Sequence, residues 1–185
     1  GYMTGDLSLR AQHLFDDLEI KQMIYQKAPT PTVWFVSSNG KLLSLSYVPE
    51  EEVGAWSQHV TDGTFESVTV VPEGDEDSVY VIVKRGSERF VERMVDQFTG
   101  EVPSLADSAY VDSSLRYSGA STTSVSGLHH LEGSTVTFLA DGVSGTAVVS
   151  GGSITLPKAA SKVVAGLPYT SEIRSVPIYA QVDQA

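Results

Sequence analysis

The sequence is informative first through what it lacks. It contains no cysteine, which excludes a disulfide framework, a thiolate metal site and a cysteine nucleophile. No stretch approaches the roughly 18 apolar residues of a membrane helix, and the first residues lack the charged and apolar regions of a signal peptide. The sequence therefore predicts no membrane segment, and the absence of cysteine leaves the compartment open.

Positive charge is also scarce. The chain has 12 lysine and arginine residues against 23 aspartate and glutamate residues, which gives a formal net charge of −11. Its close basic groupings are interleaved with acids, as where Glu88 and Glu92 lie among Arg89 and Arg93. Such a surface repels phosphate backbones, so sequence-specific nucleic-acid binding is disfavoured.

What is present is a series of short β-rich runs separated by turn residues. The stretch from Gly127 to Ile173 holds four runs rich in Val, Thr, Ile and Leu: Thr135–Ala140, Ala147–Ser150, Ser153–Leu156 and Lys162–Gly166. Asp141-Gly142 and Gly151-Gly152 are favoured turn pairs, and Pro157 is expected to close a strand. With two further strands expected at Ala109–Tyr117 and Ala120–Leu128, the stretch predicts a six- or seven-stranded small antiparallel barrel or sandwich.

The first half predicts a short helical segment followed by an antiparallel meander. Apolar residues recur at spacings of three and four across residues 7–26, which is typical of a helix, and Pro29 would end it. Six strands follow, and Asn39-Gly40 marks a hairpin between the first two. The meander resembles propeller blades of about four strands, whose missing neighbours would lie outside this chain.

The domain organisation follows from a polar connection. Residues 98–108 are broken by Gly100 and Pro103, so we expect a linker there. The chain is then divided into residues 1–97, the helix with the propeller-like meander, and residues 109–185, the small β-barrel or sandwich. The fold class is mainly β.

Several stretches resemble one protein family. YVDSSLRYSG, GLHHLEGSTVTFLADG and SGGSITLPKAASKVVAGLPYTSEI, together with the upstream YQKAPTPTVWFVSSNGKLLSLSYVPEEEVGAWSQHV, are similar to the tail tubular protein B, or tail nozzle, family of short-tailed bacteriophages. The pattern is strongest at Gly127, Leu128, His130, Leu131, Glu132, Gly133, Asp141, Gly142, Gly152, Gly166, Leu167, Pro168 and Tyr169. These are interpreted as fold positions, chiefly turns, with no active-site role. Relative to the family, the chain starts and stops in mid-sequence, as a piece of a longer protein would.

Two stretches raise the question of a metal. His129-His130 has Glu132 two residues on, but neighbours on a strand point to opposite faces, and a transition metal usually needs three or four ligands. The acidic loop from Glu73 to Asp77 is dense in oxygen ligands but lacks the spacing of a calcium-binding loop. A turn and a solvated hairpin tip are the favoured interpretations.

Catalytic motifs are equally weak. Ser126-Gly127 and Ser150-Gly151 belong to turns and not to a nucleophile elbow, and Gly151-Gly152 lacks the lysine and helix of a phosphate loop. The acidic run from Glu50 to Glu52 would need a cleft to act as a carboxylate pair. Trp34, Trp56, Tyr47 and Tyr80 lie in strands, where they are ordinary packing partners, or a sugar platform if two of them face solvent.

The leading hypothesis is a structural protein and not an enzyme. The resemblance implies a subunit of a phage tail tube or nozzle, located in the virion, that forms a ring such as a hexamer around the DNA ejection conduit. Its partners would be copies of itself, other tail or portal-adaptor proteins, and passing DNA without specific binding. The alternative is a carbohydrate- or receptor-binding β module, and a glycan hydrolase is the weakest possibility. No catalytic, cofactor-binding or metal-binding residue is assigned.

Overall fold

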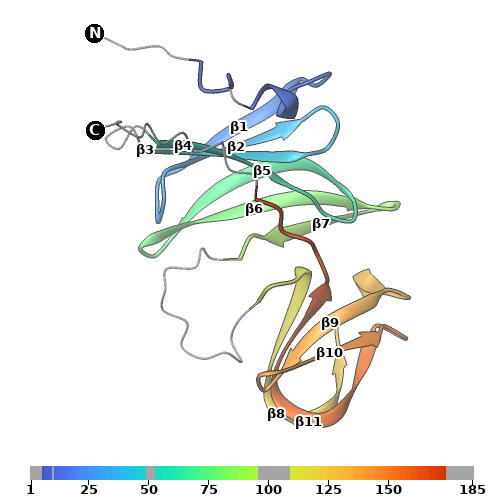
Figure 1. Ribbon diagram of the computed structural model, residues 1–185. Coiled ribbons are helices and arrows are strands. Elements are labelled where there is room, and N and C mark those ends of the chain that lie inside the picture. The colour runs from blue at the N-terminus through green and yellow to red at the C-terminus, as the bar shows by residue number, and fades with distance from the viewer. Residues whose placement is uncertain (1–5, 10, 49–52, 96–108, 174–185) are drawn as a thin grey trace, which may run out of the picture. The chain divides into compact units, whose positions relative to one another are not determined.

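The computed structural model describes residues 6–9, 11–48, 53–95 and 109–173 (Figure 1). The chain divides into two compact units, residues 1–109 (unit 1) and residues 110–185 (unit 2). The linker expected at residues 98–108 lies outside the described residues. Within the described parts, the regular structure consists of antiparallel strands and two 3-10 turns, so the mainly β fold class is confirmed.

Unit 1 contains two antiparallel sheets. Sheet A has the order β1-β2-β3-β4, and its strands are Ile20–Gln26, Thr32–Ser37, Leu42–Val48 and Val53–His59. Sheet B has the order β5-β6-β7, and its strands are Thr64–Glu73, Glu76–Arg85 and Glu88–Arg93. The six strands predicted from the sequence are therefore present, with the predicted hairpin at Asn39-Gly40, where Gly40 has a φ of +79°.

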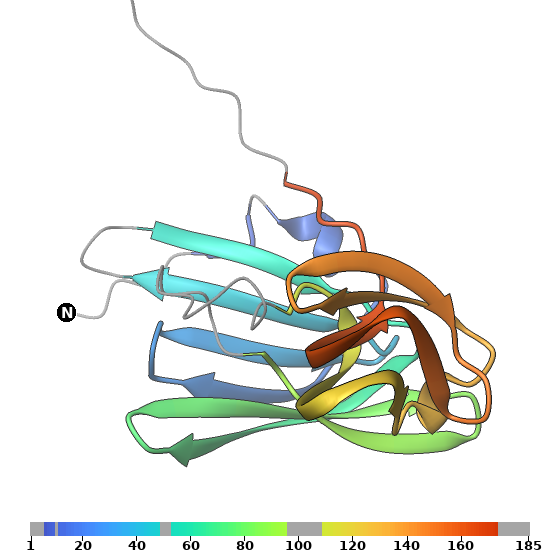
Figure 2. The same cartoon turned by 90° about the horizontal axis from the view of Figure 1, so that it is seen from below.

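The two sheets of unit 1 face each other across a shared core. In Figures 1 and 2 the blue and cyan strands of sheet A lie alongside the green strands of sheet B. Trp34, Val36 and Leu42 from sheet A pack with valines and Phe65 from sheet B. We call the face of sheet A that carries these residues its inner face. Alternation along each strand places such residues on one side, as expected for a half-buried sheet.

The prediction of a helix within residues 7–26 is wrong. The structure has a 3-10 turn at Gln12–Leu14, called η1, and then strand β1 from Ile20, with Asp17 in the left-handed region at a φ of +55°. Tertiary contacts override the helical spacing: η1 lies against the outer face of sheet A, where the Phe15 ring meets Trp56 at 4.8 Å. The residues of β1, which follow η1, pair with β2 along their length, and a helix could not make these hydrogen bonds.

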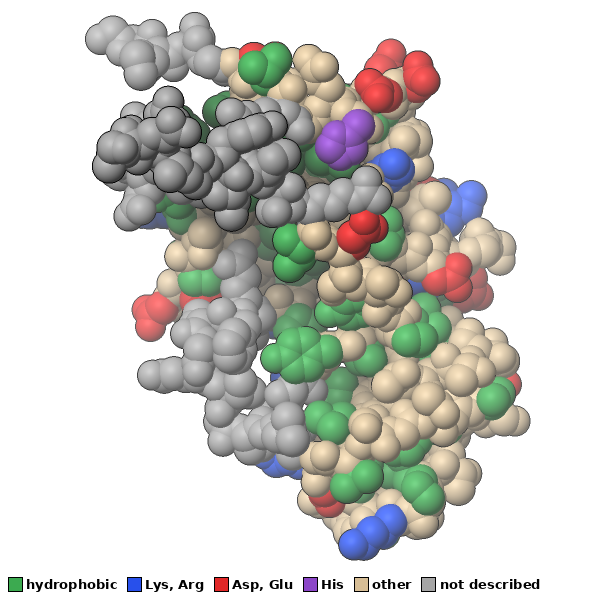
Figure 3. Space-filling model, in the orientation of Figure 1, with side chains coloured by type: hydrophobic (Ala, Val, Ile, Leu, Met, Phe, Trp, Pro, Cys, Tyr) green, Lys and Arg blue, Asp and Glu red, His purple; other side chains and the backbone are tan. Residues whose placement is uncertain are grey.

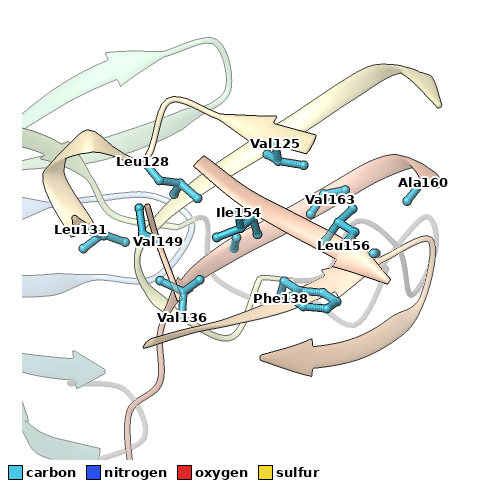
Figure 4. Close-up of a cluster of buried hydrophobic side chains, with 12 residues drawn as sticks. Val125, Leu128, Leu131, Val136, Phe138, Val149, Ile154, Leu156, Ala160 and Val163 are labelled. Carbon is cyan, nitrogen blue, oxygen red and sulfur yellow. The ribbon is translucent and has the colours of Figure 1, made fainter. Parts of the chain in front are cut away.

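Unit 2 is a single bent sheet, sheet C, in the order β10-β9-β11-β8. Its elements are β8 (Asp112–Ser126), the 3-10 turn η4 (His129–Leu131), β9 (Thr135–Ala140), β10 (Val143–Val148) and β11 (Ser153–Leu167). The described strands do not close into a barrel. They curve around a cluster of buried side chains that includes Val136, Phe138 and Ile154 (Figure 4).

The expectation of six or seven strands in unit 2 is wrong, because two pairs of predicted strands are continuous. Residues 109–128 form mainly the one long strand β8, and Ser153–Leu156 and Lys162–Gly166 both belong to β11. Pro157 does not end β11. It lies where the ladder with β8 is interrupted between Thr155 and Ala160, and such an irregularity tolerates a missing N–H.

Candidate functional site

The inner face of sheet A changes from apolar to polar between β2 and β4. Trp34 lies opposite Ser44, which in turn lies opposite Ser57. In the next row Thr32 lies opposite Ser46, and on the other side His59 lies opposite the core residue Leu42. Because directly paired residues share a face, the hydroxyls and the imidazole point to the side that faces sheet B.

A cavity of about 300 Å³ opens over this polar area. Sheet A and its β1–β2 loop line it with Gln26, Pro29, Thr32, Trp34, Ser44, Ser46, Ser57 and His59. The end of sheet B lines it with Glu76, Asp77, Ser78, Val79, Met94 and Val95. We call this space, which lies wholly within unit 1, the inter-sheet cavity.

A chain of hydrogen bonds fixes one wall of the inter-sheet cavity. The indole Nε1 of Trp34 donates to Oε1 of Gln26 at 3.0 Å, and both side chains are buried. Gln26 Nε2 donates to the Asp77 carbonyl at 2.8 Å, which ties sheet A to sheet B. The indole is thereby held in one orientation, with its polar atom satisfied and its ring left to pack against neighbours.

His59 forms the other side of this wall. Its Nε2 lies 2.9 Å from the Ser44 hydroxyl, and its ring lies 5.0 Å from the Trp34 ring. Burial lowers the pKa of His59 below its ordinary value of 6.5, which favours the neutral imidazole. Among the described residues no carboxylate hydrogen-bonds to this ring, so the Ser44–His59 pair lacks the third member of a catalytic triad.

The predicted acidic loop is the tip of the β5–β6 hairpin, and two of its carboxylates are used by the fold. Glu73 accepts hydrogen bonds from Tyr80 at 2.6 Å and from Ser78 at 2.8 Å, which together lower its pKa. Asp77 Oδ2 accepts from the backbone N–H groups of Lys27 and Ala28 at 2.8 and 3.1 Å. These bonds anchor the hairpin, as the solvated-tip interpretation expects, and leave Asp77 at the edge of the cavity.

The two neighbouring histidines of unit 2 have separate partners. His130 Nε2 lies 3.1 Å from the Ser113 carbonyl, whereas the His129 ring covers Gly152 so closely that a Cβ there would overlap it. Glu132 accepts from the N–H groups of Gly151 and Gly152 at 2.9 and 2.7 Å, and these bonds lower its pKa. His129 and Glu132 therefore contact the turn before β11, whereas His130 contacts β8, and the three side chains do not converge on one point.

Asp141, another position of the family pattern, has a similar structural role. Its carboxylate accepts from the N–H groups of Ser161 and Lys162, the latter at 2.8 Å, and these bonds lower its pKa. This ties the β9–β10 turn to the middle of β11. The interpretation of such positions as fold positions agrees with these contacts.

The two tryptophans do not form a solvent-facing platform. Trp34 is 5% exposed, and Trp56 packs between Phe15 and Phe35 while its Nε1 donates to the Leu7 carbonyl at 2.8 Å. Tyr80 is bound to Glu73. Of the four aromatics singled out in the sequence, Tyr47 is the one that is more than a third exposed.

The remaining candidates give no site. The Glu50–Glu52 run lies outside the described residues, and the described residues contain no group of three or more side chains suited to a metal. Ser150 closes the turn to Ser153, and Ser126 is the last residue of β8. Among the described residues no helix is long and apolar enough to cross a membrane.

Sequence reasoning missed Ser44, Ser46 and His59. The alternation in LLSLSYV, which puts serine at every second position, was a usable signal because such positions share one face of a strand. What the pattern could not show was that this face is turned toward sheet B. Searches among protein-family models and among curated proteins found no match to this chain.

Proposed function

We propose that this chain is a structural subunit of a phage tail tube or nozzle that assembles into a ring, with a hexamer as the expected form. The resemblance runs through nearly the whole sequence, which is specific to a family although it carries no chemistry. The ring would form part of the conduit for DNA ejection, so the protein would reside in the virion and contact other tail or portal-adaptor proteins.

The observation that carries this proposal is the presence of uncovered strand edges and apolar side chains. Among the described residues β4 pairs with β3 alone, and β10 pairs with β9 alone, so each has an edge free for another strand. Large apolar side chains lie uncovered in both units, among them Val60, which follows β4, at 62% and Val143 of β10 at 68% exposure. Open edges beside exposed apolar residues favour pairing with a second chain.

The acidic composition suggests how DNA could pass such a ring. A lumen lined by negative charge repels phosphate and lets DNA slide without sticking. On the face drawn in Figure 3 the acidic side chains (red) form separate small groups with basic side chains (blue) between them. The lumen hypothesis therefore predicts that assembly brings the acidic groups of neighbouring subunits together on the inner wall. Charge reversal of residues on that wall should slow ejection, and unchanged ejection would contradict the hypothesis.

Immunogold electron microscopy of virions that encode this chain tests the structural role. Label on the tail, in several copies per particle, is the expected result. Unlabelled virions with antigen free in the lysate would overturn the proposal. A variant with Gln58→Pro in the edge strand β4, where the N–H points away from β3, should block ring assembly, as measured by mass photometry. The substitution Ala55→Pro in the same strand, where the N–H points toward β3, should instead destabilise unit 1.

A carbohydrate- or receptor-binding role is the second candidate function. The packed tryptophans give no support to the platform that the sequence suggested. The observation in its favour is instead the inter-sheet cavity, whose lining includes hydroxyl and carboxylate groups.

A further inference from the structure

Six of the described strands lie at the edge of a sheet, and four of these edges are protected against a further strand. Charged residues, proline and irregular registers all discourage an exposed edge from pairing with another chain. β7 has four charged residues, and β8 has Asp112, Arg116 and an irregular ladder. β1 has Lys21 and a register shift, and β5 has Pro72 and a register shift.

The edges of the other two strands, β4 and β10, have none of these protections. Their sequences, VGAWSQH and VSGTAV, contain no aspartate, glutamate, lysine, arginine or proline. Each strand keeps an unshifted register with its neighbour, over seven residue pairs for β4 and six for β10. Because the same chain protects its other described edges, these two are the edges suited to accept a strand.

The free backbone groups of the two edges match in number and spacing. The register turns the N–H and C=O groups of Gly54, Trp56 and Gln58 away from β3. On β10 the groups turned away from β9 belong to every second residue from Ser144 to Val148, and the side chains of these residues are exposed. Each edge therefore presents three donors and three acceptors, as one strand presents to the next in an antiparallel ladder.

The distribution of charge favours a contact between unlike edges. Unit 1 holds 18 acidic and 8 basic residues, a formal charge of −10, whereas unit 2 holds 5 and 4, a charge of −1. Like charges brought together at an interface cost free energy, so pairing β4 with a second β4 would set two strongly acidic units side by side. Pairing β4 with β10 sets unit 1 of one copy against the nearly neutral unit 2 of another.

We infer that β4 of one copy pairs with β10 of a second copy, so that each chain joins two neighbours through two different edges. This inference rests on the proposed ring and names its contact. Pairing of an edge with its own copy is complete at a dimer, whereas a head-to-tail contact between unlike edges repeats and forms a ring when the rotation closes. Self-pairing of β10 would also leave the β4 edge open.

Two proline variants test this contact, and each blocks one edge. Gln58→Pro removes an outward N–H of β4, and Thr146→Pro removes an outward N–H of β10, while the ladder within the chain keeps its bonds. Native mass spectrometry of the full chain should show oligomers for the wild type and a monomer for each variant alone. An equimolar mixture of the two variants should form a dimer that grows no further, because one intact β4 then meets one intact β10. Gln58→Ala and Thr146→Ala, which keep both N–H groups, should assemble as the wild type does.

Every other pattern overturns the inference. Dimers of Gln58→Pro alone would show that β10 pairs with itself, and dimers of Thr146→Pro alone would show that β4 does. A monomeric wild type, or a mixture of folded variants that stays monomeric, would exclude the contact. If both variants assemble as the wild type does, the ring uses another surface, so this inference fails while the proposed function stands. Immunogold labelling of virions tests that function separately.

Charge substitutions at Thr146 give a second test that leaves the backbone unchanged. The side chain is exposed, so folding tolerates either sign of charge. In a Gln58→Pro chain mixed with the Thr146→Pro chain, Thr146→Glu should weaken the dimer about two- to fivefold relative to Thr146→Lys at low salt, because the new carboxylate meets the acidic unit 1. The same two substitutions at Thr123, an exposed residue of β8, should give dimers of equal strength. Equal dimers for the two Thr146 substitutions would also overturn the inference.

Discussion

The contact between the two sheets of unit 1 depends strongly on Gln22. Its side-chain amide imitates a strand: Nε2 donates to the Val68 carbonyl at 2.8 Å, and Oε1 accepts from the Val68 N–H at 3.0 Å and from the Ser67 hydroxyl at 2.9 Å. Val68 is 1% exposed, so a Gln22→Leu substitution would leave two buried backbone groups unsatisfied. At about 1–3 kcal/mol for each unsatisfied group, we expect unit 1 to lose about 2–6 kcal/mol of unfolding free energy.

Urea denaturation followed by tryptophan fluorescence measures this loss. Both tryptophans lie in unit 1, so the signal reports on that unit without interference from unit 2. Gln58→Leu is the matched control, because its side chain is exposed and takes part in one long hydrogen bond from Lys41 at 3.3 Å. It should change the unfolding free energy by no more than about 0.5 kcal/mol. A Gln22→Leu effect as small as the control would refute the view that this amide joins the sheets.

Three further predictions concern titration and packing. Backbone N–H groups donate to the carboxylates of Glu132 and Asp141 and hold their pKa values below the ordinary 4.5 and 3.8. Protection of unit 2 amides from hydrogen exchange should therefore be full at neutral pH and should fall as the pH drops through these lowered pKa values. Glu132→Gln should flatten that dependence. Burial lowers the pKa of His59, so the free energy of unfolding of unit 1 in urea should fall as the pH drops below about 6.5 and should level off below the folded-state pKa. The substitution His59→Gln should abolish this pH dependence. Leu128→Ala, at a fully buried site, should cost unit 2 about 2–5 kcal/mol by hydrogen exchange, against no more than about 0.5 for the exposed Val143→Ala.

Turn chemistry was the most reliable guide from sequence to structure. Asn39-Gly40 and Asp141-Gly142 connect strands as predicted, with the glycines at positive φ. These pairs act through local backbone preferences that need no information about distant residues. Proline was a weaker guide, because Pro157 stands inside β11, where a break in the ladder removes the need for its N–H. A proline predicts the loss of one hydrogen bond, and whether a strand ends there depends on the partner strand.

The N-terminal segment shows why periodicity alone fails over a short stretch. Leu14, Leu18 and Ile20 fit a helical stripe, yet the first two precede a strand and the third begins it. Within β1, Ile24 packs toward sheet B while Met23 and Tyr25 face outward, an alternation that the helical spacing concealed. Ladder partners on β2 decided the outcome, and no local signal in residues 7–26 encodes them.

The candidate site is harder to predict from the sequence than the fold is, because it depends on which part of sheet A is left uncovered by sheet B. The serines of β3 and the histidine of β4 share a face by register, which the sequence does specify. Sheet B covers the apolar part of that face and leaves Ser46 and Ser57 beside open space. Burying these hydroxyls without partners would cost free energy, so a sequence that alternates leucine with serine is compatible with a sheet that is only partly covered. The serines thus permit the cavity, but no local signal in the sequence shows that sheet B stops short of them.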